Sequence, residues 1–246
     1  KMIVALMIGR AGSKGFPGKN IIKVLGKRLC EYPILAAKKS KYIEKIYVST
    51  DCKKITKCVK KYNVIFLKRS KKLSSDKALG EDVFQDAYFQ IKKDLQKKGQ
   101  KIELIVLLMA NAATINNSLI DKGIKILKSN QKYDSAITTS VYNMWSPIRA
   151  RKFENGFLKP FIPFNKFDKK MTINCDRDSQ GEVFYADMSA SVVRPKCLEN
   201  LESGLLPQKW MGTKIAPIYS NAGFDLDFDW QVPLLEFWLK KYGRYK

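Results

Sequence analysis

The residues with the clearest chemical potential lie in a basic, glycine-rich loop at 9–20, directly after the apolar run Ile3–Ile8. Glycines let backbone N–H groups approach a phosphate closely, and lysine or arginine supplies the charge that neutralises it. The loop combines three cations, glycines at a spacing of three and two neutral hydrogen-bonding side chains: Arg10, Lys14, Lys19, Gly12, Gly15, Gly18, Ser13 and Asn20. This composition predicts a site for the phosphates of a nucleotide.

The loop matches neither of the two common phosphate-binding signatures. A Walker loop needs G-x-x-x-x-G-K-[ST], which no window here supplies, and the dinucleotide fingerprint G-x-G-x-x-G needs a different glycine spacing. The pattern present is R-x-G-S-K-G-x-x-x-K-N, from Arg10 to Asn20.

A second constellation, GFDLDFDW, occupies 223–230 near the end of the sequence. In an extended segment Asp225 and Asp227 point to one face, where two carboxylates repel each other unless a cation lies between them. Mg²⁺ prefers oxygen ligands and often takes one or two carboxylates plus substrate phosphates. We therefore predict a metal site at Asp225 and Asp227, with Asp229 as an additional or outer ligand.

Apolar periodicity predicts strands and helices that alternate through the first half of the chain. Such alternation indicates an α/β fold with a mostly parallel sheet flanked by helices. We expect Ser49 and Asp51 to cap the helix that follows them, and Asn117 or Ser118 to cap a later one. The expected strands are 3–8, 43–49, 64–67, 104–109, 135–140 and 215–219, and the expected helices are 33–39, 53–61, 81–95, 118–127 and 232–240.

The pattern loosens between Val141 and Val193, where three prolines and a charged stretch interrupt it. We predict one domain over 1–246 that carries an inserted arm at about 141–193.

Composition narrows the chemistry. The net charge of +23 suits a nucleic-acid binder, but the lysines are scattered in pairs and no arginine-rich aromatic cluster is present, so nucleic acid is not the expected partner.

The sequence has no histidine, which excludes Ser-His and Cys-His mechanisms and histidine metal sites. Five cysteines without a C-x-x-C pair favour free, mostly buried thiols. No apolar run is long enough to cross a membrane, and we expect a cytoplasmic protein.

The loop motif, together with the late D-x-D, resembles the CMP-sialic acid synthetases, or acylneuraminate cytidylyltransferases. The resemblance implies a nucleotidyltransferase fold with a dimerisation arm, a homodimer, CTP and an acidic sugar as substrates, and Mg²⁺ or Mn²⁺ as cofactor. It implies catalytic roles for Arg10, Lys19 and Asp227. The nucleotide-binding residues that it implies are Arg10, Gly12, Ser13, Lys14, Lys19, Asn20 and Arg69.

The resemblance also implies residues that bind the sugar. It implies that Arg177, Gln180 and Tyr185 of the arm bind the acidic sugar, since an arginine fork suits a carboxylate, although Lys159 or Lys166 could serve instead. The family's Q-P-T-S-P-L-R stretch is replaced here by MANAATI at 109–115, in which Asn111 is the expected substrate-binding residue.

The sequence thus predicts transfer of a cytidylyl group from CTP to a 2-keto-3-deoxy sugar acid, a sialic acid-like nonulosonic acid, with release of pyrophosphate. The altered segment at 109–115 leaves open a nucleotidyltransferase with a different acceptor, and a catalytically silent nucleotide-binding homologue is the second alternative. Metal-bound hydroxide or an aspartate near the D-x-D could deprotonate the sugar hydroxyl.

Overall fold

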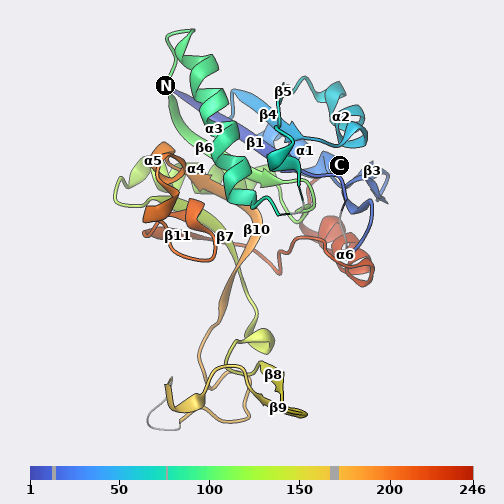
Figure 1. Cartoon of the computed structure of the whole chain (residues 1–246), viewed down its shortest axis with the longest axis vertical. Helices are drawn as coiled ribbons and strands as arrows, with labels where there is room; N and C mark the ends of the chain where they lie inside the picture. Colours follow the sequence, from blue (N-terminus) through green and yellow to red (C-terminus); the bar gives the residue numbers. More distant parts are fainter. Residues whose placement is uncertain (13–14, 76, 167–171, 246) are drawn as a thin grey trace.

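The computed structural model describes residues 1–12, 15–75, 77–166 and 172–245. Its centre is a seven-stranded sheet in the order β11-β7-β10-β6-β1-β4-β5, with helices on both faces (Figure 1). The expected α/β class with a mostly parallel sheet is confirmed. The strands are β1 (Met2–Gly9), β4 (Lys45–Thr50), β5 (Ile65–Leu67), β6 (Ile102–Met109), β7 (Ser135–Val141), β10 (Phe184–Val193) and β11 (Ile215–Tyr219).

Strand β1 explains why the sheet needs cover on both faces. Its residues are buried almost throughout, and they alternate between two apolar clusters. Ile3, Ala5 and Met7 pack in the cluster with α1 (Glu31–Lys39), α2 (Lys53–Val59) and α4 (Asn117–Ser129). The residues between them pack against α3 (Gly80–Gln96) and α5 (Pro195–Glu199). Both layers of the core therefore meet on the strand that leads into the glycine-rich loop.

Strand β10 is antiparallel to both of its neighbours, β6 and β7, while the other pairs in the sheet are parallel. Its pairing with β7 is interrupted between Ala186 and Ser191, where Met188 adopts a left-handed φ of 60°. The sequence analysis did not predict a strand at 184–193. Instead it assigned these residues to the inserted arm.

The arm leaves the sheet between β7 and β10 and projects well away from the body (Figure 1). Near its far end lies a hairpin of β8 (Arg151–Glu154) and β9 (Phe157–Pro160). Phe153, Phe157 and Leu158 are each at least two-thirds exposed there. A smaller hairpin, β2 (Lys23–Val24) with β3 (Lys27–Arg28), follows the glycine-rich loop.

Two of the expected helix caps were wrong. The N-cap of α4 is Asn116, whose side chain accepts a hydrogen bond from the Leu119 amide at 3.1 Å. Helix α2 begins after Cys52 without a side-chain cap, and Asp51 instead accepts a hydrogen bond from the Ala11 amide at 2.9 Å. The Asp51 carboxylate is therefore used to hold the glycine-rich loop.

Two further features concern the cysteines and the helices. All five cysteines are free thiols, but just two, Cys30 and Cys197, are buried, so the expectation that most are buried was wrong. Among the described residues, no helix has the length and apolar character needed to span a membrane.

Candidate active site

The glycine-rich loop lies at the carboxyl end of β1, the edge at which open parallel sheets bind their ligands. Gly12 and Gly18 have left-handed φ values of 76° and 74°, which an L side chain rarely adopts. The Asn20 side chain donates to the Arg10 carbonyl at 3.2 Å and so closes the loop on itself. Two predicted nucleotide ligands, Ser13 and Lys14, lie outside the described residues.

A cavity of about 320 Å³ lies beside this loop. Five of the predicted site residues line it together: Arg10, Lys19, Asn20, Arg69 and Asn111. The remaining lining residues are small or apolar and come from the ends of β1 and β6 and from the start of α3, including Ala78, Gly80, Val83 and Met109. Polar groups contribute the larger share of the exposed wall, which suits a charged ligand.

Arg69 is at the wall of this cavity with a side chain that is 6% exposed. Its guanidinium donates to the carbonyl oxygens of Gly9 at 2.9 Å and Leu73 at 3.1 Å. It also lies 3.8 Å from the Asp51 carboxylate. Burial lowers the pKa of Arg69, an effect that Asp51 opposes. Arg69 thus braces the start of the glycine-rich loop, and its contact with a nucleotide stays a prediction.

The D-x-D segment reaches the same place from the other end of the chain. Asp225 and Asp227 lie in an irregular stretch between β11 and helix α6 (Val232–Tyr242), and this stretch forms no strand. Leu226 between them is 1% exposed and packs with Leu235 and Trp238 of α6. Neither flanking carboxylate lines the cavity itself, but each contacts a residue that does, Asp225 through Asn111 and Asp227 through Lys19.

Lys19 joins the two ends of the chain. Its ammonium group forms an ion pair with the Asp227 carboxylate, and the Lys19 side chain is 11% exposed against 51% for Asp227. The neighbouring Asp225 is half-buried and accepts a hydrogen bond from the Asn111 amide at 3.1 Å. Burial and the Asp227 charge raise the pKa of Asp225, while Lys19 and Asn111 oppose the rise. Burial is the larger cause, and the charge of Asp227 adds to it.

The carboxylate pair fits a hard divalent cation. A cation between Asp225 and Asp227 would relieve the repulsion that raises the pKa of Asp225. Across the described part of the chain, no cluster of three or more metal-ligating side chains is present. Asp229 bonds locally, since its carboxylate accepts from the Trp230 amide at 2.8 Å. A cation here would thus have two protein carboxylates and take its other ligands from phosphates and water, as Mg²⁺ often does.

The three arm residues predicted to bind the sugar do not line the cavity beside the loop. Arg177 is exposed and forms a bidentate pair with its neighbour Asp178, at 3.1 and 3.0 Å. Gln180 accepts from Arg149 at 3.1 Å, and the Tyr185 hydroxyl donates to the Trp145 carbonyl. Within one chain, these side chains therefore lie apart from the cavity beside the glycine-rich loop.

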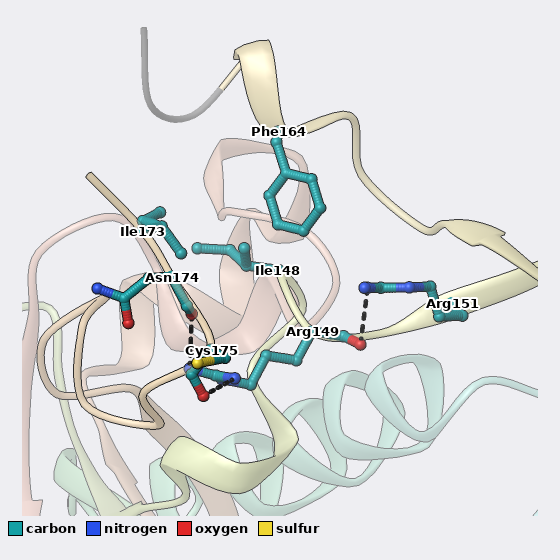
Figure 2. Close-up of a pocket in the computed structure, with 7 residues that line it drawn as sticks. All are labelled: Ile148, Arg149, Arg151, Phe164, Ile173, Asn174 and Cys175. Atoms are coloured by element: carbon teal, nitrogen blue, oxygen red, sulfur yellow. Dashed lines mark hydrogen bonds between the residues drawn. The ribbon is translucent and has the colours of Figure 1, made fainter. Parts of the chain in front are cut away.

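Arg149 organises this part of the arm and was missed by the sequence analysis. Figure 2 shows its guanidinium reaching the backbone of the 174–175 segment, where it donates to the Asn174 and Cys175 carbonyls at 3.5 and 3.3 Å. It lines an arm cavity of about 460 Å³ together with Arg151, whose guanidinium lies over the Phe164 ring. The signal available in the sequence was an arginine two residues after Pro147.

The sequence matches a family model. The model, described as cytidylyltransferase, covers residues 4–155, more than half of the chain.

This chain belongs to the cytidylyltransferase family.

Individual cytidylyltransferases are similar to it at low identity. A pseudaminic acid cytidylyltransferase and UDP-2,4-diacetamido-2,4,6-trideoxy-beta-L-altropyranose hydrolase of Helicobacter pylori is 30% identical over 159 residues, which is 64% of this chain and 29% of that protein. An N-acylneuraminate cytidylyltransferase of Escherichia coli is 25% identical over 186 residues, which is 75% of this chain and 42% of that protein. The chain thus spans less than half the length of these two curated relatives.

Solved structures confirm the nucleotidyltransferase fold. A CMP:2-keto-3-deoxy-manno-octonic acid synthetase complexed with CTP superposes with a TM-score of 0.68 over 98% of this cytidylyltransferase-family chain and 99% of its own. Its sequence identity is 12%, so this likeness concerns the fold alone. A 4-diphosphocytidyl-2C-methyl-D-erythritol synthase has a TM-score of 0.65 at 11% identity.

Proposed function

We propose that this chain is a cytidylyltransferase that activates a 2-keto-3-deoxy sugar acid of the nonulosonic type with CTP. The anomeric hydroxyl oxygen of the sugar would form a bond to the α-phosphorus of CTP. The bond from that phosphorus to the bridging oxygen of pyrophosphate would break, and the hydroxyl proton would be released. The products are a CMP-sugar and pyrophosphate.

One observation carries the proposal. Lys19, from the loop after the first strand, is ion-paired with Asp227 of the late D-x-D, at the edge of a cavity that Arg10 also lines. Cations and a carboxylate pair are thereby placed where a triphosphate, a divalent cation and an attacking oxygen could meet. Family membership over residues 4–155 supports the same chemistry.

The proposed roles follow from charge. Negative charge builds on the phosphoryl oxygens and on the leaving pyrophosphate, and Arg10 and Lys19 would stabilise it. Asp225 and Asp227 would hold Mg²⁺, which supplies further charge neutralisation when bound. The Lys19 ammonium would then exchange its contact with Asp227 for contacts with phosphate.

The names of similar proteins support the acceptor class. Pseudaminic acid and N-acylneuraminate cytidylyltransferases both act, by name, on acidic sugars. Arg177, Gln180 and Tyr185 would reach such a sugar if the arm crosses to a second copy, so we also propose a cytoplasmic homodimer with Mg²⁺ as cofactor. The apolar side chains exposed on the β8–β9 hairpin support burial of the arm against a partner.

A different acceptor is the second candidate. The MANAATI segment at 109–115 departs from the stretch that lines the sugar pocket in the family, and its Asn111 is engaged with Asp225. This observation favours a nucleotidyltransferase whose acceptor differs from sialic acid in the groups that face β6.

Pyrophosphate release tests both candidates. The assay combines the protein with CTP, Mg²⁺ and a panel that includes N-acylneuraminic acid, pseudaminic acid and 2-keto-3-deoxy-manno-octonic acid, with UTP as the matched nucleotide control. We expect pyrophosphate release with one of these acids when the nucleotide is CTP. We expect no release with UTP and no release in EDTA. Thermal stabilisation by CTP without release from any acid would favour the different acceptor, and the absence of both would contradict the proposed function.

A further inference from the structure

The D-x-D segment has an unusual means of support. Residues 223–226 belong to no helix or strand, yet they connect β11 to the end of the chain and carry Asp225. An irregular segment of this kind must satisfy its backbone N–H and C=O groups by other partners. Here those partners come from the carboxyl ends of β6 and β7.

Two residues after β6 hold the second half of the segment. Thr114, which is fully buried, accepts a hydrogen bond from the Phe224 amide and donates one to the Phe224 carbonyl, each at 2.9 Å. The Asn111 carbonyl accepts from the Leu226 amide at 2.9 Å, and the Asn111 side chain donates to the Asp225 carboxylate. The backbone on both sides of Asp225 is thus fixed to the same short stretch of chain.

Two residues at the end of β7 hold the first half. The Ser140 hydroxyl accepts from the Gly223 amide at 2.8 Å and donates to the Asp187 carboxylate of β10 at 2.9 Å. The Tyr142 hydroxyl donates to the Gly223 carbonyl at 3.0 Å. Burial and the nearby Asp187 raise the pKa of Tyr142 to about 12, so this hydroxyl keeps its proton for that bond.

Gly223 is required where these contacts meet. A Cβ atom there would lie 2.3 Å from a carboxylate oxygen of Asp187, which is itself buried. The close approach of Gly223 to β10 is what allows Ser140 to bond the segment and Asp187 at once.

We propose that Thr114, Ser140 and Tyr142 are positioning residues that fix 223–226 so that Asp225 and Asp227 share one cation. None of the three lines the cavity beside the glycine-rich loop. They would act on the metal through the backbone alone. The inference rests on the proposed function in one respect, namely that the carboxylate pair is the metal site.

The reason is electrostatic. Two carboxylates that face one another repel, and a free segment would let them separate until a cation had to draw them back together. A segment fixed at both ends keeps them in place before the cation arrives, so the cation does not have to order the loop. Outer contacts of this kind typically change metal affinity about 10–100-fold.

Tyr142 connects residues 223–226 to the arm. It is the first residue after β7, its ring stacks on Trp145 with centroids 5.1 Å apart, and it meets Tyr185 edge-on at 6.1 Å. A single hydrogen bond, from the Tyr142 hydroxyl to the Gly223 carbonyl, therefore links the root of the arm to residues 223–226. A shift of the arm that breaks this bond would reach Asp225 through Gly223.

The chain offers a matched control for Ser140. Ser135 lies at the other end of the same strand, is equally buried, and donates its hydroxyl to the Met211 carbonyl at 2.6 Å. Ser135→Ala and Ser140→Ala each delete one buried hydroxyl from β7. We expect both to lower thermal stability, but Ser140→Ala alone to change metal binding.

The experiment measures Mn²⁺ affinity by calorimetry in the presence of CTP, and CTP affinity separately in EDTA. For Ser140→Ala and Thr114→Val we expect Mn²⁺ affinity to fall about 10–100-fold, with metal-free CTP affinity unchanged. Tyr142→Phe should give a smaller loss in the same direction. Thr114→Ser keeps the hydroxyl and should restore wild-type Mn²⁺ affinity, and it decides the role of Thr114 if the valine variant does not fold.

Equal Mn²⁺ affinity in Ser140→Ala and Ser135→Ala would overturn the proposal, because the hydroxyl would then have a structural role only. Failure of the wild-type chain to bind Mn²⁺ would also overturn it. If the chain binds Mn²⁺ with the expected differences among variants but releases no pyrophosphate from any sugar acid, the proposed function fails and the positioning role stands.

Discussion

The candidate site has two proposed halves, a nucleotide half that would bind CTP and an acceptor half that would bind the sugar. The two are built in different ways. In the nucleotide half, Arg10, Lys19 and Arg69 converge on one cavity at the carboxyl edge of the sheet. In the acceptor half, Arg177 and Gln180 lie on an arm that projects away from the body, and they bond to neighbours within that arm (Figure 1).

The difference shows what a single chain can organise by itself. A loop that follows a buried strand receives its position from that strand, so its side chains converge without further help. A long arm receives its direction from its root, so the proposed second copy would have to supply the contacts of its far end. Substitutions in each half would show whether the two halves work separately.

Lys19→Ala should produce the largest loss, because it removes the cation that links the loop to Asp227. We expect the rate of pyrophosphate release to fall about 10²–10³-fold, the usual effect of losing one such stabilising contact. The assay should be paired with thermal unfolding, which should change little. Lys23→Ala, an exposed lysine four residues along, is the control, and an equal loss there would show that bulk charge and not position matters.

Asp227→Asn should weaken Mn²⁺ binding at least as much as the loss of an outer contact does, which is about 10–100-fold. It also removes the like charge that, after burial, raises the pKa of Asp225. If Asp225 is a metal ligand, Mn²⁺ needs its ionised form, so in the wild type Mn²⁺ affinity should fall with decreasing pH, beginning above the ordinary range of an aspartate. In Asp227→Asn this fall should move to lower pH. Calorimetry across a pH series measures both, and a pH profile identical to wild type would contradict the paired-carboxylate assignment.

Arg177→Ala tests the acceptor half. If Arg177 binds the sugar carboxylate, KM for the sugar should rise about tenfold or more, since a hydrogen bond to a charged group is worth about 1.5–3 kcal/mol. KM for CTP should stay the same, because the nucleotide half is separate. Arg151→Ala, another exposed arm arginine, is the control. A rise in KM for CTP in Arg177→Ala would break the separation of the two halves.

Glu31→Gln should have the smallest effect, and on stability alone. Burial would raise the pKa of Glu31, but Lys61, Tyr62 and the Arg28 amide bond its carboxylate and lower it overall. Its stabilising effect is therefore present at neutral pH and is lost as pH falls through the lowered pKa. We expect Glu31→Gln to lower the free energy of unfolding by about 1–2 kcal/mol at pH 7. This difference from the wild type should become smaller toward pH 3. Denaturant unfolding at several pH values measures this, and a constant difference would contradict the assignment.

Local patterns were sufficient for most of the nucleotide half. The run Ile3–Ile8 predicts the first strand, and the glycines after it predict a loop, without knowledge of any distant contact. The same holds for β6, whose apolar residues are continuous. The D-x-D was found as a motif from its local spacing, and its carboxylates bond Asn111 and Lys19.

What could not be predicted depends on contacts between distant residues. Strand β10 mixes polar and small residues and is broken by a left-handed Met188, so its sequence lacks a clean period of two. Asp51 looked like a helix cap because its partner, the Ala11 amide, is 40 residues away. Thr114 gave no signal either, since its partner at 224 is known only once the chain has folded.

The support of residues 223–226 has a consequence for the motions of the chain. The amides of Gly223, Phe224 and Leu226 are bonded to Ser140, Thr114 and Asn111, so they open to solvent only when the sheet edge opens. Amide hydrogens in such positions exchange at the rate of the cooperative unit that contains their acceptors. Residues 223–226 form no helix or strand, but their bonded amide hydrogens should exchange as slowly as those of a strand. The amide hydrogens of the exposed residues at 221–222 should exchange quickly.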